Sequence, residues 1–226
     1  MESETPVERR NRALISYAVV TGARASALAS FRLGDVDLEE GCVDQDARHV
    51  RTKFGKTFRT VLMPVSEMAM SLARDWHAER SADPLSTPED PLFPATEVGL
   101  NQDGNFVGTG LAKHGWTTSG PVRDIFRDAF HAAGLPYYNP HSFRDMLVHH
   151  LLGLDLPIET LKALSQNLGH SDLMTTIANY RQISLSRQTH LIKEGLRKRD
   201  AAPNVLQNPA VLAAVMRAIE DGAGRA

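Results

Sequence analysis

Six side chains of this sequence have the types that phosphodiester chemistry requires. They are Arg24, Lys53, His141, Arg144, His170 and Tyr180. A phenol, with a free pKa of about 10, becomes a competent nucleophile when its proton is removed or its oxyanion is stabilised. Guanidinium groups supply that stabilisation, and an amine can donate a proton to a leaving alkoxide. Together, these groups could break a phosphodiester without a metal.

His141 and Arg144 lie three residues apart in the motif His-Ser-Phe-Arg. We expect a helix from 140 to about 153, with Asn139 as its cap and Pro140 in its first turn. On that helix the two side chains project from one face, about 5–6 Å apart at Cβ, near a helix N-terminus that favours an anion. An ordinary pair on a helix surface is the alternative interpretation.

The other candidates flank turns. His170 follows Gly169, where a helix opened by Pro157 should end, and Tyr180 lies in the next helix. A structural histidine and a half-buried tyrosine are the alternatives. Arg24 follows the expected end of the first helix at Gly22, and Lys53 lies near the tip of an expected hairpin. Either base could instead be an ordinary surface charge.

The elements that must position these groups form a mainly α fold with a small antiparallel β-sheet, that is, an α+β fold. The expected helices cover 7–21, 24–33, 66–79 and 121–133, and the three already described are followed by a basic helix to about 199 and an apolar one over 208–220. Residues 42–50 and 58–64 predict a hairpin around Phe54-Gly55-Lys56, which a third short strand can extend. Residues 81–120 predict a long loop with short elements, which is uncommon in a compact domain unless the loop is functional.

Composition sets limits on the class of protein. Of 226 residues, 42% are hydrophobic and 23% charged, as in an ordinary soluble globular chain. The polar N-terminus predicts no secretory signal, and no apolar run reaches membrane-spanning length. The single cysteine, Cys42, excludes a disulfide framework within one chain, and a reducing cytoplasmic compartment fits.

Charge is segregated along the chain although the net charge is only −2. Residues 35–46 hold six acids and no base, whereas 48–60 hold five bases and no acid. A second basic run extends from Arg181 to Arg199. Such segregation is compatible with a basic face that binds nucleic acid, or with a set of solvated surface charges.

In this order, the motifs resemble the catalytic domain of the tyrosine recombinases, the phage integrase family. That family carries TGxRxxEL, a hairpin lysine of TKxGK type followed by a VPL-like strand, HxxR, LGH and a C-terminal tyrosine. The corresponding segments here are TGARASAL at 21–28, TKFGK at 52–56 with VLMP at 61–64, HSFR at 141–144, LGH at 168–170, and Tyr180. The resemblance spans roughly residues 7–192.

The resemblance implies a role for each group in a metal-free and ATP-free strand exchange. Arg24 and Arg144 would bind the non-bridging oxygens of the scissile phosphate, and His170 would add a hydrogen bond. His141 would assist proton transfer from Tyr180, which would form a 3′-phosphotyrosyl bond, while Lys53 would protonate the leaving 5′-hydroxyl. It also implies double-stranded DNA as substrate, with Arg51, Lys56, Arg59 and Arg181 as DNA-binding candidates, and no cofactor.

The resemblance further implies an assembly. We expect a catalytic domain over 1–200, without the α-helical core-binding domain that usually precedes it, and two or four protomers gathered on DNA. Residues 201–226 would be a linker and a helix that docks on a neighbouring protomer or folds back on its own domain. The chain departs from the family pattern at Ala27, where an acid is usual, at Asp145, where a base is usual, and in the ten-residue spacing from His170 to Tyr180.

Two other functions remain open from the sequence. One is a DNA-binding module of the same fold without activity, against which the complete set of six residues argues. The other is a metal-dependent nuclease that uses His141, His149, His150 and His170. Because His149 and His150 are adjacent, they point to different faces of a helix and cannot easily share one metal ion.

Overall fold

A computed structural model describes residues 5–154, 156–169 and 188–190. The chain divides into two compact units, Met1–Asn179 and Tyr180–Ala226. In the second unit, only residues 188–190 are described, and they are helical. The domain boundary expected near residue 200 and the helix expected over 208–220 therefore lie outside the described residues.

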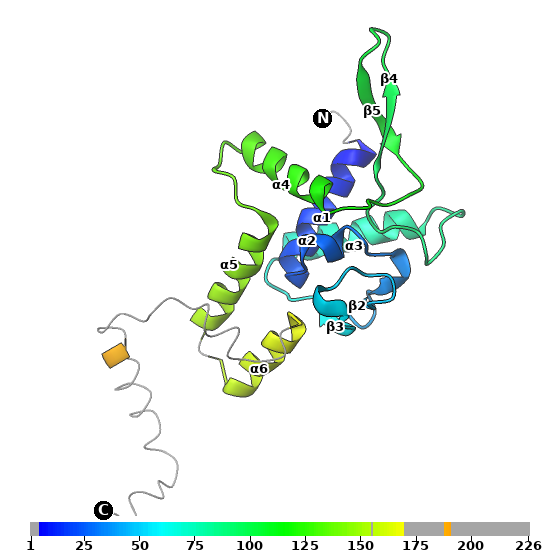
Figure 1. Cartoon of the computed structure of the whole chain (residues 1–226). Helices are drawn as coiled ribbons and strands as arrows, with labels where there is room; N and C mark the ends of the chain where they lie inside the picture. Colours follow the sequence, from blue (N-terminus) through cyan, green and yellow to red (C-terminus); the bar gives the residue numbers. More distant parts are fainter. Residues whose placement is uncertain (1–4, 155, 170–187, 191–226) are drawn as a thin grey trace, which may run out of the picture. The chain divides into compact units, whose positions relative to one another are not determined.

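Helix α1 (Pro6–Thr21) forms the centre of the first unit (Figure 1). Thr5 and Glu8 close a capping box at its start, with the Glu8 amide 3.2 Å from Thr5 Oγ1, so two N–H groups without intrahelical partners are satisfied. Gly22 ends the helix at φ +60°, as predicted, and turns the chain toward the short helix α2 (Ala25–Leu28). Helix α2 is much shorter than the expected 24–33, because the chain leaves it at Ala29 for a 3-10 turn at Leu33–Asp35.

The three-stranded sheet has the order β1-β2-β3 and is antiparallel throughout. Its strands are β1 (Val36–Asp37), β2 (Cys42–Gln45) and β3 (Phe58–Val61). The predicted hairpin and its third strand are thus confirmed, with strands shorter than expected. In place of a tight turn around Phe54, residues 46–57 form a wide loop between β2 and β3, and this loop contains a 3-10 turn at Lys53–Gly55.

A second hairpin, β4 (Thr96–Leu100) and β5 (Phe106–Leu111), lies in the segment expected to be a long loop. Figure 1 shows it projecting from the helices. Buried Arg10 of α1 anchors its base, donating to the Pro94 carbonyl at 2.6 Å and to Thr96 Oγ1 at 3.1 Å, with the Trp116 ring centroid 4.9 Å away. Burial lowers the pKa of this guanidinium to about 10.

The main core lies among α1, α2, α3 (Glu67–Ser81) and α4 (Gly120–Ala132). Its largest fully buried side chains are Tyr17, Phe31, Phe93 and Phe126. Both α3 and α4 were predicted within one or two residues, because apolar residues recur at helical spacing. In the structure, Ser66 caps the start of α3 and Pro121 lies in the first turn of α4.

A smaller cluster joins α5 (Pro140–Gly153) and α6 (Ile158–Asn167) to the segment after β3. It consists of Met63, Leu147, Val148, Leu151 and Leu168, all buried. Since Met63 also donates its amide to the Val20 carbonyl at 2.7 Å, the cluster is tied to the end of α1. No helix in the described part of the chain is long and apolar enough to span a membrane.

Candidate active site

Arg24 stands at the junction between α1 and α2. It is the N-cap residue of α2 in extended conformation, two residues after the left-handed Gly22. Its side chain is half-buried, and burial lowers the pKa of the guanidinium. Partial burial of a cation at a helix N-terminus costs free energy unless an anion or a hydrogen-bond acceptor lies next to it.

Arg144 approaches the same junction from α5. Its side chain is only 4% exposed, and it donates to the Gly22 carbonyl at 2.8 Å and to the Leu168 carbonyl. The pKa of Arg144 is lowered to about 10, chiefly by burial and also by the charge of Arg24, while the charge of Asp145 opposes the shift. The structure therefore brings Arg24 and Arg144 close enough for their charges to interact.

Two like charges in a partly buried site repel each other, and an anion between them would relieve that repulsion. A phosphate diester is such an anion, and the planar fork of arginine is suited to its oxygens. Arg24 and Arg144, 120 residues apart in the sequence, thus lie at the same junction of the fold, where the repulsion between their charges favours a bound anion. Their role in binding a phosphate stays a prediction.

Glycines allow the close packing around this junction. A Cβ on Gly22 would lie 2.7 Å from Leu168 Cδ2, and one on Gly169 would lie 2.6 Å from the Phe58 ring. Both residues have positive φ, +60° and +71°, where L side chains are disfavoured. The glycines of the TGAR and LGH motifs therefore let α1, α5 and the end of α6 meet at one place.

Asn167 fixes the end of α6 against the sheet. Its side-chain amide pairs with the exposed edge of β3 like an additional strand residue: Oδ1 accepts from the Val61 amide at 2.6 Å and Nδ2 donates to the Val61 carbonyl at 3.0 Å. Thr60 Oγ1 also donates to the Asn167 carbonyl at 3.1 Å. These contacts place Leu168 and Gly169. The role of Asn167 was not predicted from the sequence, although the residue stands directly before the LGH motif.

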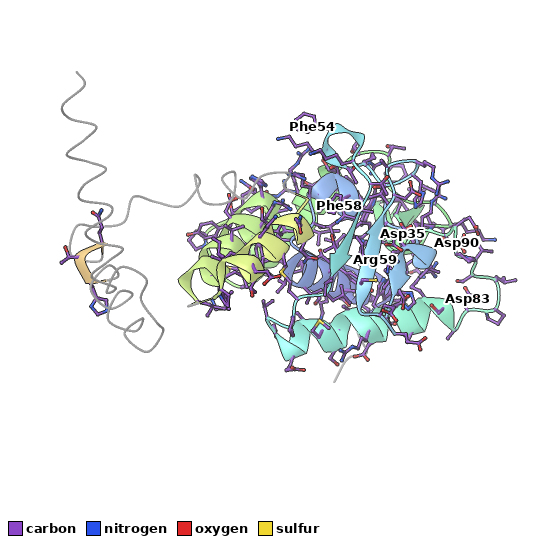
Figure 2. All side chains as sticks on the ribbon, turned by 90° about the horizontal axis from the view of Figure 1, so that it is seen from below. Asp35, Phe54, Phe58, Arg59, Asp83 and Asp90 are labelled. Atoms are coloured by element: carbon purple, nitrogen blue, oxygen red, sulfur yellow. The ribbon has the colours of Figure 1, made fainter. Side chains whose placement is uncertain are left out.

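Lys53 lies in the exposed turn Lys53–Gly55 rather than at the tip of a regular hairpin. Its Nζ is 4.9 Å from the centroid of the Phe54 ring, which is 82% exposed and points outward in Figure 2. Phe54 and Gly55 both have positive φ, so the turn is tight and its backbone at Phe54 is strained. The amine is thus presented on the surface of a sharply bent loop.

His141 lies at the start of α5 with its side chain 64% exposed, and its Nε2 is 3.7 Å from Asp145 Oδ1. The Asn139 side chain accepts hydrogen bonds from the amides of His141 and Ser142, at 2.9 and 3.1 Å, which confirms the predicted cap. The cap also occupies two of the N–H groups expected to attract an anion at this helix start. Any anion here must therefore be held mainly by side chains.

The bases predicted to bind DNA have different environments. Lys56 is exposed. Arg59 donates to both carboxylate oxygens of Asp44, at 2.7 and 2.8 Å, and this hydrogen bonding lowers the pKa of Asp44. The guanidinium of Arg51 donates to backbone carbonyls of Ala29, Trp116 and Thr117. The acidic and basic runs of the sequence thus partly pair across β2 and β3.

His170, Tyr180 and Arg181 lie outside the described residues, so their roles stay predictions. Ala27, where the family usually has an acid, is 1% exposed and belongs to the main core. Among the residues that the structure describes, no three His, Cys, Asp or Glu side chains gather as a metal site.

Comparison with known proteins identifies the family. The sequence model described as "Phage integrase family" matches residues 1–187. The chain belongs to this family. Similar curated members include the tyrosine recombinase XerD of Neisseria meningitidis serogroup B, 28% identical over 181 residues that cover 77% of this chain and 51% of that protein. The tyrosine recombinase XerC of Corynebacterium efficiens is 29% identical over 189 residues, 80% of this chain and 51% of that protein.

Solved structures confirm the fold of this phage integrase family chain. The XerA recombinase aligns with a TM-score of 0.56 at 20% identity, over 83% of this chain and 59% of that chain. The XerH site-specific recombinase bound to difH substrate aligns with a TM-score of 0.52 at 22% identity, over 85% of this chain and 48% of that chain. The chain thus has the expected catalytic-domain fold, and it spans about half the length of the curated relatives it matches.

Proposed function

We propose that this chain is the catalytic part of a site-specific DNA recombinase that cleaves and rejoins strands through a covalent 3′-phosphotyrosyl intermediate. The observation that carries the proposal is the convergence of Arg24 and Arg144 at the junction of α1, α2 and α5. Such a pair is suited to the non-bridging oxygens of a phosphodiester, and phosphoryl transfer depends mainly on positioning and on stabilising those oxygens.

The remaining steps follow from the other candidates. Tyr180 attacks phosphorus, the bond from phosphorus to the 5′-oxygen breaks, and Lys53 donates a proton to that oxygen. His141 assists removal of the phenol proton, and His170 adds a hydrogen bond to the phosphoryl group. The energy of the broken bond is kept in the phosphotyrosyl link, so rejoining requires neither ATP nor a metal.

The proposal also covers the binding partners of the protein and the compartment in which it acts. The substrate is double-stranded DNA, and further protomers assemble on it, with residues 201–226 as the segment that contacts a neighbour. Similar proteins are named as recombinases, and one neighbour was solved bound to its difH substrate. We also propose that the protein acts in the bacterial cytoplasm, at the nucleoid when it is bound to DNA.

The test is a covalent trapping experiment. The protein is incubated in chelator with a nicked suicide substrate, and adducts are separated under denaturing conditions. We expect an adduct that is absent from Tyr180→Phe and strongly reduced in Arg144→Lys. Cleavage that requires added metal and persists in Tyr180→Phe would point to a nuclease, and binding without any adduct would point to a DNA-binding module. Either result overturns the proposal.

A further inference from the structure

The backbone of Arg51 is held by two serines, Ser26 within α2 and Ser30 just after its end. Its amide donates to Ser30 Oγ at 2.9 Å, and its carbonyl accepts from Ser26 Oγ at 3.0 Å. Since Arg24 is the N-cap residue of this same helix, the backbone of Arg51 is attached directly to the element that presents Arg24. We call Ser26, Ser30 and Arg51 the serine–arginine clasp.

The guanidinium of Arg51 extends the attachment to two further segments. Nη2 donates to the carbonyls of Ala29, at 3.1 Å, and Trp116, at 3.0 Å, and Nη1 donates to that of Thr117 at 3.1 Å. Ala29 is the C-cap of α2, and residues 116 and 117 lie shortly before α4. A side chain that donates to three carbonyls is placed to hold backbone segments together, since each bond contributes only when the segments keep their spacing.

The turn that carries Lys53 begins two residues later, at the surface of the described structure. None of its three residues is buried. Phe54 adopts φ +62°, which costs a non-glycine residue roughly 1–2 kcal/mol. Strain of this kind persists only where the neighbouring structure enforces it. The clasp on Arg51 is the attachment on the N-terminal side of the turn, and strand β3 begins on the other side at Phe58.

We propose that the serine–arginine clasp positions Lys53 relative to Arg24, so that Ser26, Ser30 and Arg51 are positioning residues for proton donation to the leaving oxygen. The proposal rests on the proposed function. In the step concerned, the Tyr180 oxygen forms a bond to phosphorus, the bond to the 5′-oxygen breaks, and one proton passes from Lys53 Nζ to that oxygen. A displaced amine would leave an alkoxide to depart unprotonated, which slows cleavage.

A substrate with a different leaving atom distinguishes a role in positioning the general acid from a role in folding, DNA binding or phosphate binding. In a substrate with sulfur in place of the bridging 5′-oxygen, the leaving thiolate is far less basic than an alkoxide and needs no proton. A defect in proton donation therefore disappears on the sulfur substrate, whereas a defect in folding, DNA binding or phosphate binding persists. Lys53→Ala provides the reference for complete loss of the acid, expected to be roughly 100-fold or more on oxygen.

We expect Arg51→Met and the double variant Ser26→Ala with Ser30→Ala to cleave the oxygen substrate at least 10-fold more slowly than the unchanged protein. On the sulfur substrate, both variants should cleave within about 3-fold of the rate of the unchanged protein, because the lost rate comes mostly from general acid catalysis, which this substrate does not need. The matched control is Arg48→Met, which removes the same charge from the same loop; the Arg48 side chain is 87% exposed and donates to Asp46. Relative to the unchanged protein, Arg48→Met should show the same cleavage rate ratio on the oxygen and the sulfur substrate.

Equal losses on both substrates would overturn the proposal, as would unchanged rates. In particular, a phosphate contact by Arg51 would give equal losses and a salt dependence of DNA binding that is shallower by about 0.9. If Arg51→Met does not fold, as judged by its urea unfolding curve, the serine variants decide alone. Failure of the proposed function is distinct, because the unchanged protein would then form no adduct with either substrate.

Discussion

The guanidinium of Arg144 donates a hydrogen bond to the carbonyl oxygen of Gly22, which precedes it by 122 residues, with the two atoms 2.8 Å apart. The same side chain also donates to the Leu168 carbonyl. One buried arginine thus ties together the end of α1, the body of α5 and the end of α6. Its position is set by backbone groups before any substrate binds, which is how a catalytic group is held ready.

Arg144→Lys tests this double role. A lysine keeps the charge but has no planar fork, so it cannot donate to both carbonyls in the same geometry. We expect the free energy of unfolding to fall by about 1–3 kcal/mol and adduct formation to fall by about 100-fold or more. Urea unfolding and the trapping assay measure the two effects, with Arg123→Lys on the exposed face of α4 as the control. Near-normal adduct formation by Arg144→Lys would refute a role for the fork.

Gly22→Ala tests the close approach at the end of α1. Alanine at φ +60° costs roughly 1–2 kcal/mol. The new methyl group would also lie 2.7 Å from Leu168 Cδ2, and such overpacking costs about 1–3 kcal/mol more. Gly41→Ala is matched in φ, at +65°, but has open space. In urea unfolding, Gly22→Ala should therefore lose clearly more stability than Gly41→Ala, and equal losses would show that Leu168 simply moves away.

The sequence was sufficient where local rules decide the structure. The starts of α1, α4 and α5 carry capping residues or prolines, Gly22 ends α1, and apolar spacing marks the helices. The two site arginines were found because each lies in a short motif. The β4–β5 hairpin was missed because its strands are exposed and rich in glycine, so no apolar alternation marks them. Asp103-Gly104 in its turn was the signal that could have found it.

Contacts between distant segments were beyond local rules. Nothing in the spacing of Ser26 and Ser30 predicts that they hold Arg51, or that Asn167 pairs with the edge of β3. Likewise, the separate acidic and basic runs gave no indication that Asp44 neutralises Arg59. Such pairings depend on strand register and on loop paths, which only the folded chain determines.

Asp44→Asn tests whether Arg59 can bind DNA. The change removes the carboxylate that accepts both hydrogen bonds from Arg59. If Arg59 then contacts a phosphate, DNA affinity should rise, and the slope of log affinity against log salt should steepen by about 0.9. Glu39→Gln is the matched control, because it changes the net charge equally at an exposed position that is not part of the Arg59–Asp44 pair. Equal effects of both variants would indicate net charge alone.

Arg24→Met should separate stability from activity, with opposite signs. Burial lowers the pKa of Arg24, and its charge lowers that of Arg144, so the folded state without DNA is penalised by this second cation. Removing it relieves both costs, and methionine keeps much of the apolar stem. We therefore expect the free energy of unfolding to be unchanged or to rise by roughly 0.5–2 kcal/mol, as is common where an active site is not optimised for stability. Adduct formation should nevertheless fall by about 100-fold or more, because one of two groups that stabilise the phosphoryl oxygens is lost.

Urea unfolding and the trapping assay on the same preparation of Arg24→Met provide the comparison, with Arg144→Met as the counterpart that should lose both stability and activity. A clear loss of stability in Arg24→Met would mean that Arg24 supports the fold itself, and that the repulsion between the two arginines is not what prepares the site for an anion.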